Sequence, residues 1–299
     1  MSEKKKKTNK KKVTKEKRHF ILEKVPYLIL IIALLIIYAR YVGTKGITVR
    51  DYNITSTNIP SSFDGFTIVQ FSDLKYGSTV NMDDLDKLVK KINDLNPDVV
   101  VFTGDLISPN YKLDMEEKEK ITQKFALIDP LIGKYSVRGN EDNASSNYDY
   151  IINTSNFKDI SNSYELIYYK GLTPIVIYGL DSLINKKQDF KTAFAYPDEN
   201  VSTDYMATYR ILLAHEPDTV TKIKSYNISL MLSGHSLNST VNIPYLKDYY
   251  DIKGASKYYD PIYNVDGTKL YVSSGIGTNN SRIRFLSKPS ISIFRLYTK

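Results

Sequence analysis

The sequence predicts one α/β domain behind a single apolar helix near the N-terminus. Three observations support this prediction. Residues 25–39 carry no charge between Lys24 and Arg40. Short apolar runs that end in a polar residue recur along residues 47–299, as expected for buried strands that end in loops. Amphipathic stretches lie between some of these runs, so strands and helices are interleaved along the chain.

The charge is confined to one end of the chain. The net charge is +8, and residues 1–24 hold eleven Lys and Arg residues against three Glu, so the rest of the chain is balanced. The folded part is therefore not expected to bind nucleic acid. The basic tail, residues 1–24, is expected to lie in the cytoplasm and to touch anionic lipid head groups. The chain contains no cysteine, which excludes disulfides and cysteine-bound zinc.

The apolar segment is interpreted as a transmembrane anchor over residues 25–42. Its fifteen uncharged residues are fewer than the roughly 17 to 25 that span a bilayer, so Lys24 and Arg40 are expected to snorkel. No small-x-small cleavage site follows, which favours an anchor over a cleaved signal peptide. The positive-inside rule places residues 43–299 outside the cell membrane, so we expect a single-pass protein. Residues 43–46 form a short linker, and the domain over 47–299 should lie close to the bilayer.

The pattern after the linker predicts individual elements in turn. A first strand is expected over 47–52, followed by a βαβ unit over 67–105 whose helix covers 81–95 and stops before Asn96-Pro97. Further elements are a helix over 115–128 and strands at 135, 174–178, 210–215, 230–235, 269–273 and 290–296. Residues 140–163, rich in Asn, Ser, Asp and Tyr, are expected to form an irregular surface excursion.

Five apolar runs end in a residue that offers an oxygen or nitrogen donor, and these donors are Asp73, Asp105, Asn140, His215 and His235. Sites in open α/β sheets lie beyond the carboxyl ends of the strands, so the five are expected to converge. Taken singly each is weak, because a strand-end Asp commonly caps a turn and a histidine after an apolar run is commonly a core residue. The ordered set favours a metal site.

The order Ser-Asp, Gly-Asp, Gly-Asn, Ala-His-Glu-Pro and Ser-Gly-His resembles the calcineurin-like metallophosphoesterase superfamily. The flanking segments at 60–65, 215–218 and 271–278 resemble its membrane-anchored bacterial branch, and the likeness covers nearly the whole chain after the anchor. The resemblance implies a sandwich of two mixed β-sheets flanked by helices and a phosphoesterase centre with two metal ions about 3.5 to 4 Å apart. It implies that Asp105 bridges the ions, Asn140, His215 and His235 complete the second, and Asp73 serves the first.

The sequence departs from this superfamily at three positions. Lys75 and Leu237 stand where the first ion's histidine ligands are expected, and Glu141 replaces the histidine after Gly-Asn. A protonated lysine has no free lone pair and leucine has no donor atom. We therefore expect one divalent transition metal ion (manganese, iron or zinc) rather than two. Lys75 is expected to pair with Asp73 as a fixed cation, and Glu141 to assist proton transfer, which makes these two the candidate catalytic residues.

The leading hypothesis is a membrane-anchored phosphoesterase with a divergent, mononuclear centre that acts on a phosphorylated small molecule or envelope component. The alternative is a pseudoenzyme that keeps the fold to bind a phosphorylated envelope ligand or a partner protein. Metal content separates the two poorly because a binding protein can also keep an ion. Turnover separates them well.

Overall fold

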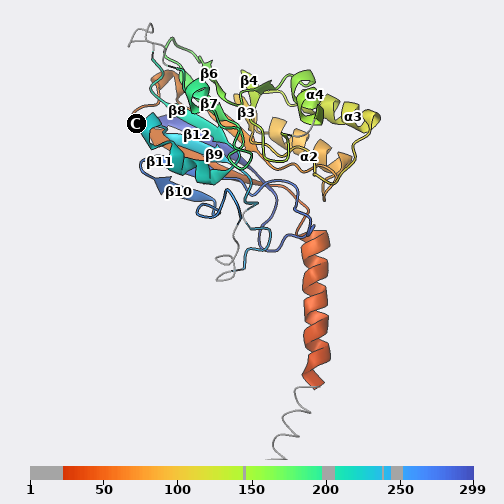
Figure 1. Ribbon diagram of the computed structural model, residues 1–299. Helices are drawn as coiled ribbons and strands as arrows, with labels where there is room; N and C mark the ends of the chain where they lie inside the picture. Colours follow the sequence, from red (N-terminus) through yellow and green to blue (C-terminus); the bar gives the residue numbers. More distant parts are fainter. Residues whose placement is uncertain (1–22, 144–145, 197–205, 238, 244–251) are drawn as a thin grey trace, which may run out of the picture.

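The computed structural model of the protein describes residues 23–143, 146–196, 206–237, 239–243 and 252–299. A helix over Glu23–Val42 projects from one end of the folded part (Figure 1) and is long and apolar enough to cross a membrane. Its last five residues, Tyr38–Val42, form a π-helical turn, η1. The predicted apolar helix is therefore present. The basic tail, residues 1–22 in particular, lies outside the described residues.

The first sheet has six strands in the order β1-β12-β2-β3-β4-β5. The strands are β1 (Thr48–Ser56), β2 (Thr67–Phe71), β3 (Val99–Phe102), β4 (Gly133–Ser136), β5 (Lys158–Asp159) and β12 (Ser290–Thr298). From β2 to β5 the neighbours are parallel, whereas β12 runs antiparallel to β2 and parallel to β1. The parallel β2–β3 pair confirms the βαβ unit.

The second sheet also has six strands, in the order β10-β11-β9-β8-β7-β6. The strands are β6 (Ser163–Ile167), β7 (Ile175–Leu180), β8 (Arg210–Ala214), β9 (Leu230–Ser233), β10 (Ile262–Val265) and β11 (Thr268–Val272). β7, β8, β9 and β11 are parallel, and β6 and β10 are antiparallel edge strands. The expected sandwich of two mixed sheets flanked by helices is confirmed.

Apolar side chains fill three layers around these sheets. The layer between the sheets includes Ile68, Val101, Ile211 and Leu232. The helices on the outer face of the first sheet are α2 (Met82–Asn93), α3 (Met115–Ala126) and α4 (Ser146–Thr154), and the second sheet is covered by α5 (Phe190–Ala193), η4 (Pro217–Lys222) and η5 (Lys224–Tyr226); a 3-10 turn, η2, spans Ser61–Phe63. Because both faces of the central strands are buried, they read as nearly continuous apolar runs.

Local chemistry explains where the helices begin. Asn81 caps α2 by accepting from the backbone N–H of Asp84, whose carboxylate accepts in turn from the N–H of Asn81. Asp114 caps α3 through the N–H of Glu117. The helices predicted over 81–95 and 115–128 are confirmed, and each ends two residues earlier than predicted.

The prediction of an irregular segment over 140–163 is wrong. This stretch contains α4 and β5, and it ends at the first residue of β6. Tyr148, Ile151 and Ile152 of α4 are fully buried against the first sheet. Their helical spacing is the signal that the polar composition concealed, because the Asn, Ser and Asp residues lie on the outer face or in the turns.

Candidate metal centre

The carboxyl ends of five strands meet at one edge of the two sheets. The loops after β2 and β3 are joined by backbone hydrogen bonds, from the N–H of Asp73 to the oxygen of Gly104 (2.8 Å) and from the N–H of Lys75 to the oxygen of Asp105 (3.0 Å). The loops after β8 and β9 are joined by the N–H of Gly234 and the oxygen of His215 (3.0 Å). The N–H of Glu141, after β4, donates to Asp105 Oδ1 (3.0 Å), and the N–H of His235 donates to Asp73 Oδ2 (2.9 Å). The expected convergence of the five strand ends is thus present.

Two glycines in these loops allow the close approach. A Cβ on Gly139 would lie 2.2 Å from Asp105 Oδ1, and a Cβ on Gly234 would lie 1.9 Å from Ser72 Oγ. Any side chain at either position would push the loops apart. The glycines of the Gly-Asn and Gly-His pairs are therefore required for the donors to come together.

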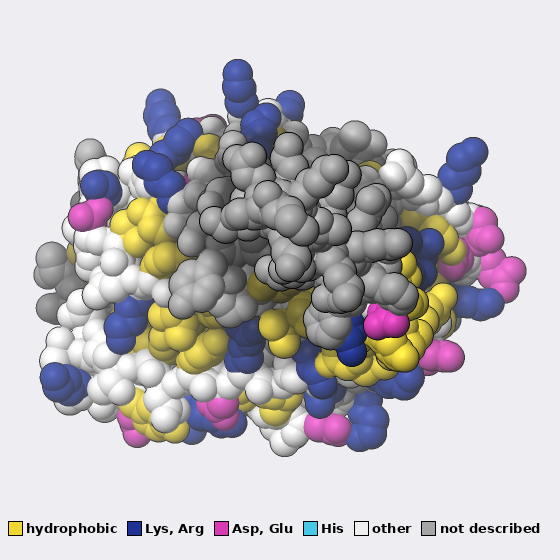
Figure 2. Space-filling view, turned by 90° about the horizontal axis from the view of Figure 1, so that it is seen from below, with side chains coloured by type: hydrophobic (Ala, Val, Ile, Leu, Met, Phe, Trp, Pro, Cys, Tyr) yellow, Lys and Arg dark blue, Asp and Glu magenta, His cyan; other side chains and the backbone are white. Residues whose placement is uncertain are grey.

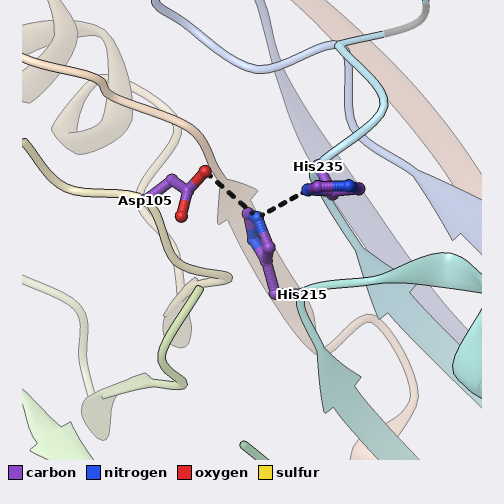
Figure 3. Close-up of side chains that lie close together, drawn as sticks. All are labelled: Asp105, His215 and His235. Carbon is purple, nitrogen blue, oxygen red and sulfur yellow. Dashed lines mark hydrogen bonds and ion pairs between the residues drawn. The ribbon is translucent and has the colours of Figure 1, made fainter. Parts of the chain in front are cut away.

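Asp105, His215 and His235 form a cluster whose ligand atoms all lie within 4.8 Å of one another. In Figure 3 the three side chains point toward one another, with His215 in the middle. His215 Nε2 lies 3.3 Å from Asp105 Oδ2 and 3.3 Å from His235 Nδ1. Asp105 and His215 are fully buried, and His235 is half-buried.

Backbone carbonyls determine which ring nitrogens carry protons. The second nitrogen of His215, Nδ1, lies 2.6 Å from the oxygen of Thr103, and that of His235, Nε2, lies 2.8 Å from the oxygen of Lys253. Each of these nitrogens must donate a proton to its carbonyl. In the neutral rings, the lone pairs of His215 Nε2 and His235 Nδ1 then face each other beside the Asp105 carboxylate, so only a proton or a cation can satisfy all three.

Asp73 and Asn140 add two buried oxygens that have no hydrogen-bond partner, Asp73 Oδ1 and Asn140 Oδ1. Asp73 Oδ1 lies 4.0 Å from His215 Nε2, and Asp73 Oδ2 accepts from Ser72 Oγ (2.7 Å) and from the N–H of His235 (2.9 Å). Buried oxygens of this kind are normally paired. With the imidazoles, they are donors that suit a manganese, iron or zinc ion.

Lys75 lies inside the site, and its side chain is only 5% exposed. Its Nζ lies 2.8 Å from Asp105 Oδ2 and 2.7 Å from Glu141 Oε1. Lys75 was expected to pair with Asp73, but it pairs with Asp105 and Glu141 instead. The difference arises because the hydrogen bond between the N–H of Lys75 and the oxygen of Asp105 draws Lys75 toward the β3 loop.

Opposite charges in the site keep Lys75 and Asp105 ionised. Burial lowers the pKa of Lys75, but the carboxylates of Asp105, Asp73 and Glu141 outweigh burial, so the pKa is raised and the ammonium stays charged. Burial likewise raises the pKa of Asp105, but His215 and Lys75 outweigh it and hold this pKa well below its usual range. The single ammonium of Lys75 faces the carboxylates of Asp105, Asp73 and Glu141, so the site favours a further positive charge.

Leu237 fills space beside Asp73 with hydrocarbon. The side chain is fully buried, and its Cδ2 lies 2.6 Å from the position that a Cβ on Gly275 would take, while Asp73 Cβ lies 2.7 Å from that same position. Leu237 also has a positive φ of 51°. A leucine in this strained backbone region is uncommon, which indicates that the turn is imposed by the surrounding loops.

Sequence reasoning missed one carboxylate of the site, Asp142. It is 2% exposed and accepts hydrogen bonds from the backbone N–H groups of Asp105 (2.7 Å), Leu106 (2.9 Å) and Gly139 (2.8 Å). Burial, with the charge of Asp105, raises the pKa of Asp142 to about 7 against these three hydrogen bonds. Asp142 ties the β3 loop to the β4 loop. The only signal in the sequence is a second acidic residue two positions after Asn140.

Glu216 has a similar structural role in the second sheet. It is fully buried and accepts from Ser182 Oγ and from the backbone N–H groups of Leu183 (2.9 Å) and Ile184 (3.3 Å). These hydrogen bonds hold the loop after β7 against the residue that follows His215. The next loop residue, Asn185, donates from Nδ2 to the oxygen of Asn140 (2.8 Å), so this loop also orients Asn140.

Comparison with known proteins identifies relatives of the whole fold. The sequence model of the calcineurin-like phosphoesterase family matches residues 66–239. The chain is 29% identical to the uncharacterized metallophosphoesterase YkuE of Bacillus subtilis over 263 residues, which cover 87% of this chain and 88% of that protein. It is 27% identical to the UDP-2,3-diacylglucosamine pyrophosphatase LpxG of Chlamydia trachomatis over 296 residues, which cover 80% of this chain and 86% of that protein. A transmembrane protein with a metallophosphoesterase domain from Danio rerio is 25% identical, over 88% of this chain and 60% of that protein.

Proposed function

Because the chain belongs to the calcineurin-like phosphoesterase family, we propose that it hydrolyses a phosphoester at a centre that holds one divalent metal ion. Asp105, Asn140, His215 and His235 would hold the ion, and Asp73 would contribute from the neighbouring loop. The observation that carries this proposal is the spacing of the three ligand atoms: His215 Nε2 lies 3.3 Å from His235 Nδ1 and 3.3 Å from Asp105 Oδ2.

A divalent ion at this position supplies positive charge for the phosphoryl oxygens and lowers the pKa of a water molecule. The rest of the work falls to the protein. The ammonium of Lys75 lines the pocket that adjoins the site, where it can face a phosphoryl oxygen while it neutralises Asp105. A fixed ammonium needs no reorganisation during the reaction, which is the main advantage of a preorganised charge.

Glu141 is the proposed proton carrier. Burial, together with the charge of Asp105, raises the pKa of Glu141, and its Oε2 is buried without a hydrogen-bond partner. Its other oxygen pairs with Lys75, and its N–H donates to Asp105 Oδ1 (3.0 Å), so the carboxyl group is held in place. A carboxyl group with a raised pKa in a pocket can protonate a leaving group.

The proposal also includes the location. We propose a single-pass membrane protein with the basic tail in the cytoplasm and the domain outside, anchored by the helix over Glu23–Val42. Because the chain has no cysteine, single cysteines introduced as Thr8→Cys or Lys299→Cys can be labelled selectively. In intact cells an impermeant maleimide should label the second variant and not the first. The reverse pattern would overturn the orientation.

The substrate class is proposed from the site and from one relative. The Chlamydia trachomatis relative is named as a pyrophosphatase of a diacylated sugar nucleotide. This supports a phosphorylated envelope component, rather than a nucleic acid, as the substrate of the present chain.

The test is metal analysis of the purified full chain together with hydrolysis of bis(p-nitrophenyl) phosphate and p-nitrophenyl phosphate. Near one equivalent of metal and measurable turnover are expected, and both should be lost in His215→Ala and in His235→Ala. The matched control is His19→Ala, which changes the third histidine of the chain, in the basic tail. Two tightly bound ions in the unmodified protein would contradict the mononuclear centre.

One observation favours a second candidate, a phosphate-binding protein without turnover. Lys75 already engages the Asp105 oxygen that faces His215, which weakens the attraction of the site for a cation. Metal-independent binding of inorganic phosphate with no turnover of either ester would establish this candidate instead.

A further inference from the structure

The candidate metal centre opens into a pocket of about 540 Å³. Lys75 and Glu141 line this pocket, and its other walls come from loops that no part of the proposed chemistry uses. Pockets of this size hold drug-sized ligands, so the space exceeds what a phosphoryl group alone requires. Three of the wall residues, Val241, Ile252 and Ile283, are apolar and half-buried.

The apolar wall of this pocket is built on the end of the N-terminal helix. Val241 forms a β-bridge with Phe285, and the N–H of Phe285 donates to the oxygen of Thr240 (2.8 Å). The ring of Phe285 packs edge-on against Tyr38, with 6.2 Å between the ring centroids. Phe285 therefore lies between Tyr38 and Val241 of the pocket wall. The end of the helix therefore supports the segment that lines the pocket.

The contact between the helix and the pocket wall leaves no free space. The N–H of Arg284 donates to the oxygen of Ala39 (2.9 Å), and a Cβ on Gly43 would lie 1.9 Å from the oxygen of Arg284. The guanidinium of Arg284 is fully buried and donates to the oxygens of Ser274 and Gly277. The N–H of Gly277 donates in turn to the oxygen of Asp73 (2.8 Å). The helix is thus connected to the metal-site loops and is not a loose tether.

The length of the helix determines how far the pocket would lie from the bilayer. Its 20 residues rise about 30 Å, about the thickness of the hydrocarbon core of a bilayer, so Lys24 and Arg40 near its two ends would snorkel to the two interfaces. Tyr38 to Val42 would then lie at the interface, and Leu286, which is 62% exposed and follows Phe285, would lie beside them. On this side of the molecule, hydrophobic side chains lie among Lys and Arg side chains (Figure 2), as expected of a surface that meets lipid head groups.

We propose that the pocket opens toward the bilayer and takes an amphiphilic phosphoester whose phosphate lies at Lys75 and whose acyl part leaves along Val241 and Ile283 into the membrane. This inference rests on the proposed function, and it adds that the substrate is membrane-embedded and that the anchor positions the pocket. In the reaction a water oxygen bonds to phosphorus, the bond to the leaving oxygen breaks, and the released proton passes to the leaving group or to solvent.

The test compares two p-nitrophenyl phosphodiesters with the same reacting group, one of a diacylglycerol embedded in phosphatidylcholine vesicles and one of glycerol without acyl chains. The full chain is reconstituted in the same vesicles. Ile283→Asp and a flexible Gly-Ser insertion between Val42 and Gly43 should each lower hydrolysis of the diacyl ester by about tenfold or more, because the effective concentration of membrane substrate at the pocket falls. Hydrolysis of the soluble ester should stay within about twofold.

Two matched controls exclude general damage. Leu131→Asp places a charge on an apolar side chain that is 73% exposed, and the same Gly-Ser insertion between Asp266 and Gly267 enlarges an exposed hairpin turn. Neither should affect either ester. Equal loss on both esters, or no loss in either test variant, would overturn the membrane-facing pocket and leave the proposed hydrolysis standing.

A turnover-independent readout covers the case in which neither ester is hydrolysed, which would count against the proposed function. With p-benzoylphenylalanine at position 283, irradiation should cross-link the protein to phosphatidic acid in the vesicles, and Lys75→Met should reduce the yield. Cross-linking with phosphatidylcholine alone to the same extent would show general lipid contact and overturn the phosphate-directed site.

Discussion

The two halves of the candidate metal centre meet at Asp105 and handle charge differently. We name them the ligand half, which consists of Asn140, His215 and His235, and the lysine half, which consists of Lys75, Leu237 and Glu141. The ligand half presents imidazole and amide donors and no lysine or arginine, with 3.3 Å between the facing nitrogens of His215 and His235. The lysine half carries its own cation, 2.8 Å from Asp105. A cation that is part of the chain cannot be lost to chelators, but it supplies one charge rather than two and activates no water.

The largest effect is expected from a change at Asp105, the residue that both halves share. Asp105→Asn removes a ligand from one half and the counter-ion of Lys75 from the other. Metal content should fall from near one equivalent to near zero, and hydrolysis should fall by at least about a thousandfold, since charge stabilisation is the largest catalytic term. Asp98→Asn is the matched control, because Asp98 lies just before β3 and its carboxylate accepts from the N–H and the hydroxyl of Thr67, away from the site. Retained metal in Asp105→Asn would contradict its place in the site.

The second-largest effect is expected when the ammonium of the lysine half is removed. Lys75→Met removes an ammonium that is 5% exposed and leaves Asp105 and Glu141 without the cation that they share. The free energy of unfolding of the metal-free protein should fall by about 3 to 5 kcal/mol, and added manganese should recover more stability than it does in the unmodified chain. The control, Lys90→Met, removes an exposed pair with Asp94 and should cost about 0.5 kcal/mol or less. Chemical denaturation with and without manganese measures both variants.

A third experiment converts the lysine half into a second ligand set. Lys75→His with Leu237→His should raise metal content toward two equivalents, because Leu237 lies against the same loop as Asp73. Adding Glu141→His should increase hydrolysis by a further hundredfold or so, the usual contribution of one well-placed acid or base. Lys75→His alone should change little. If the triple variant binds two ions and is no faster than the unmodified protein, these substitutions do not limit activity.

The smallest expected effect concerns the connection between the two β-strand loops. In Asp142→Asn the best amide orientation still serves the N–H groups of Asp105 and Gly139, but it turns the NH₂ group toward the N–H of Leu106. This mismatch should cost about 1 to 3 kcal/mol in unfolding free energy. Asp64→Asn, whose amide oxygen can still accept the one exposed hydrogen bond from the N–H of Thr298, should cost less than a third of that. An equal cost for the two would show that Asp142 does not stabilise the site.

The sequence by itself determined the strands that end at the site and the donors they present. Buried parallel strands must be apolar on both faces, so their ends are visible as abrupt changes to polar residues such as Asp105 and His215. Local hydrogen bonding likewise placed the helix that starts at Asn81. These features depend on neighbours along the chain.

Only the tertiary structure decided which donors pair and what the pocket faces. Lys75 contacts Asp105 rather than Asp73 because a backbone hydrogen bond between two loops aims it there. The proton positions of His215 and His235 follow from carbonyls distant in the sequence, at Thr103 and Lys253. The packing of Phe285 against Tyr38 brings together residues from opposite ends of the chain. Each of these contacts spans a sequence separation that no local pattern encodes, because the closing of long loops is settled by the packing of the whole fold.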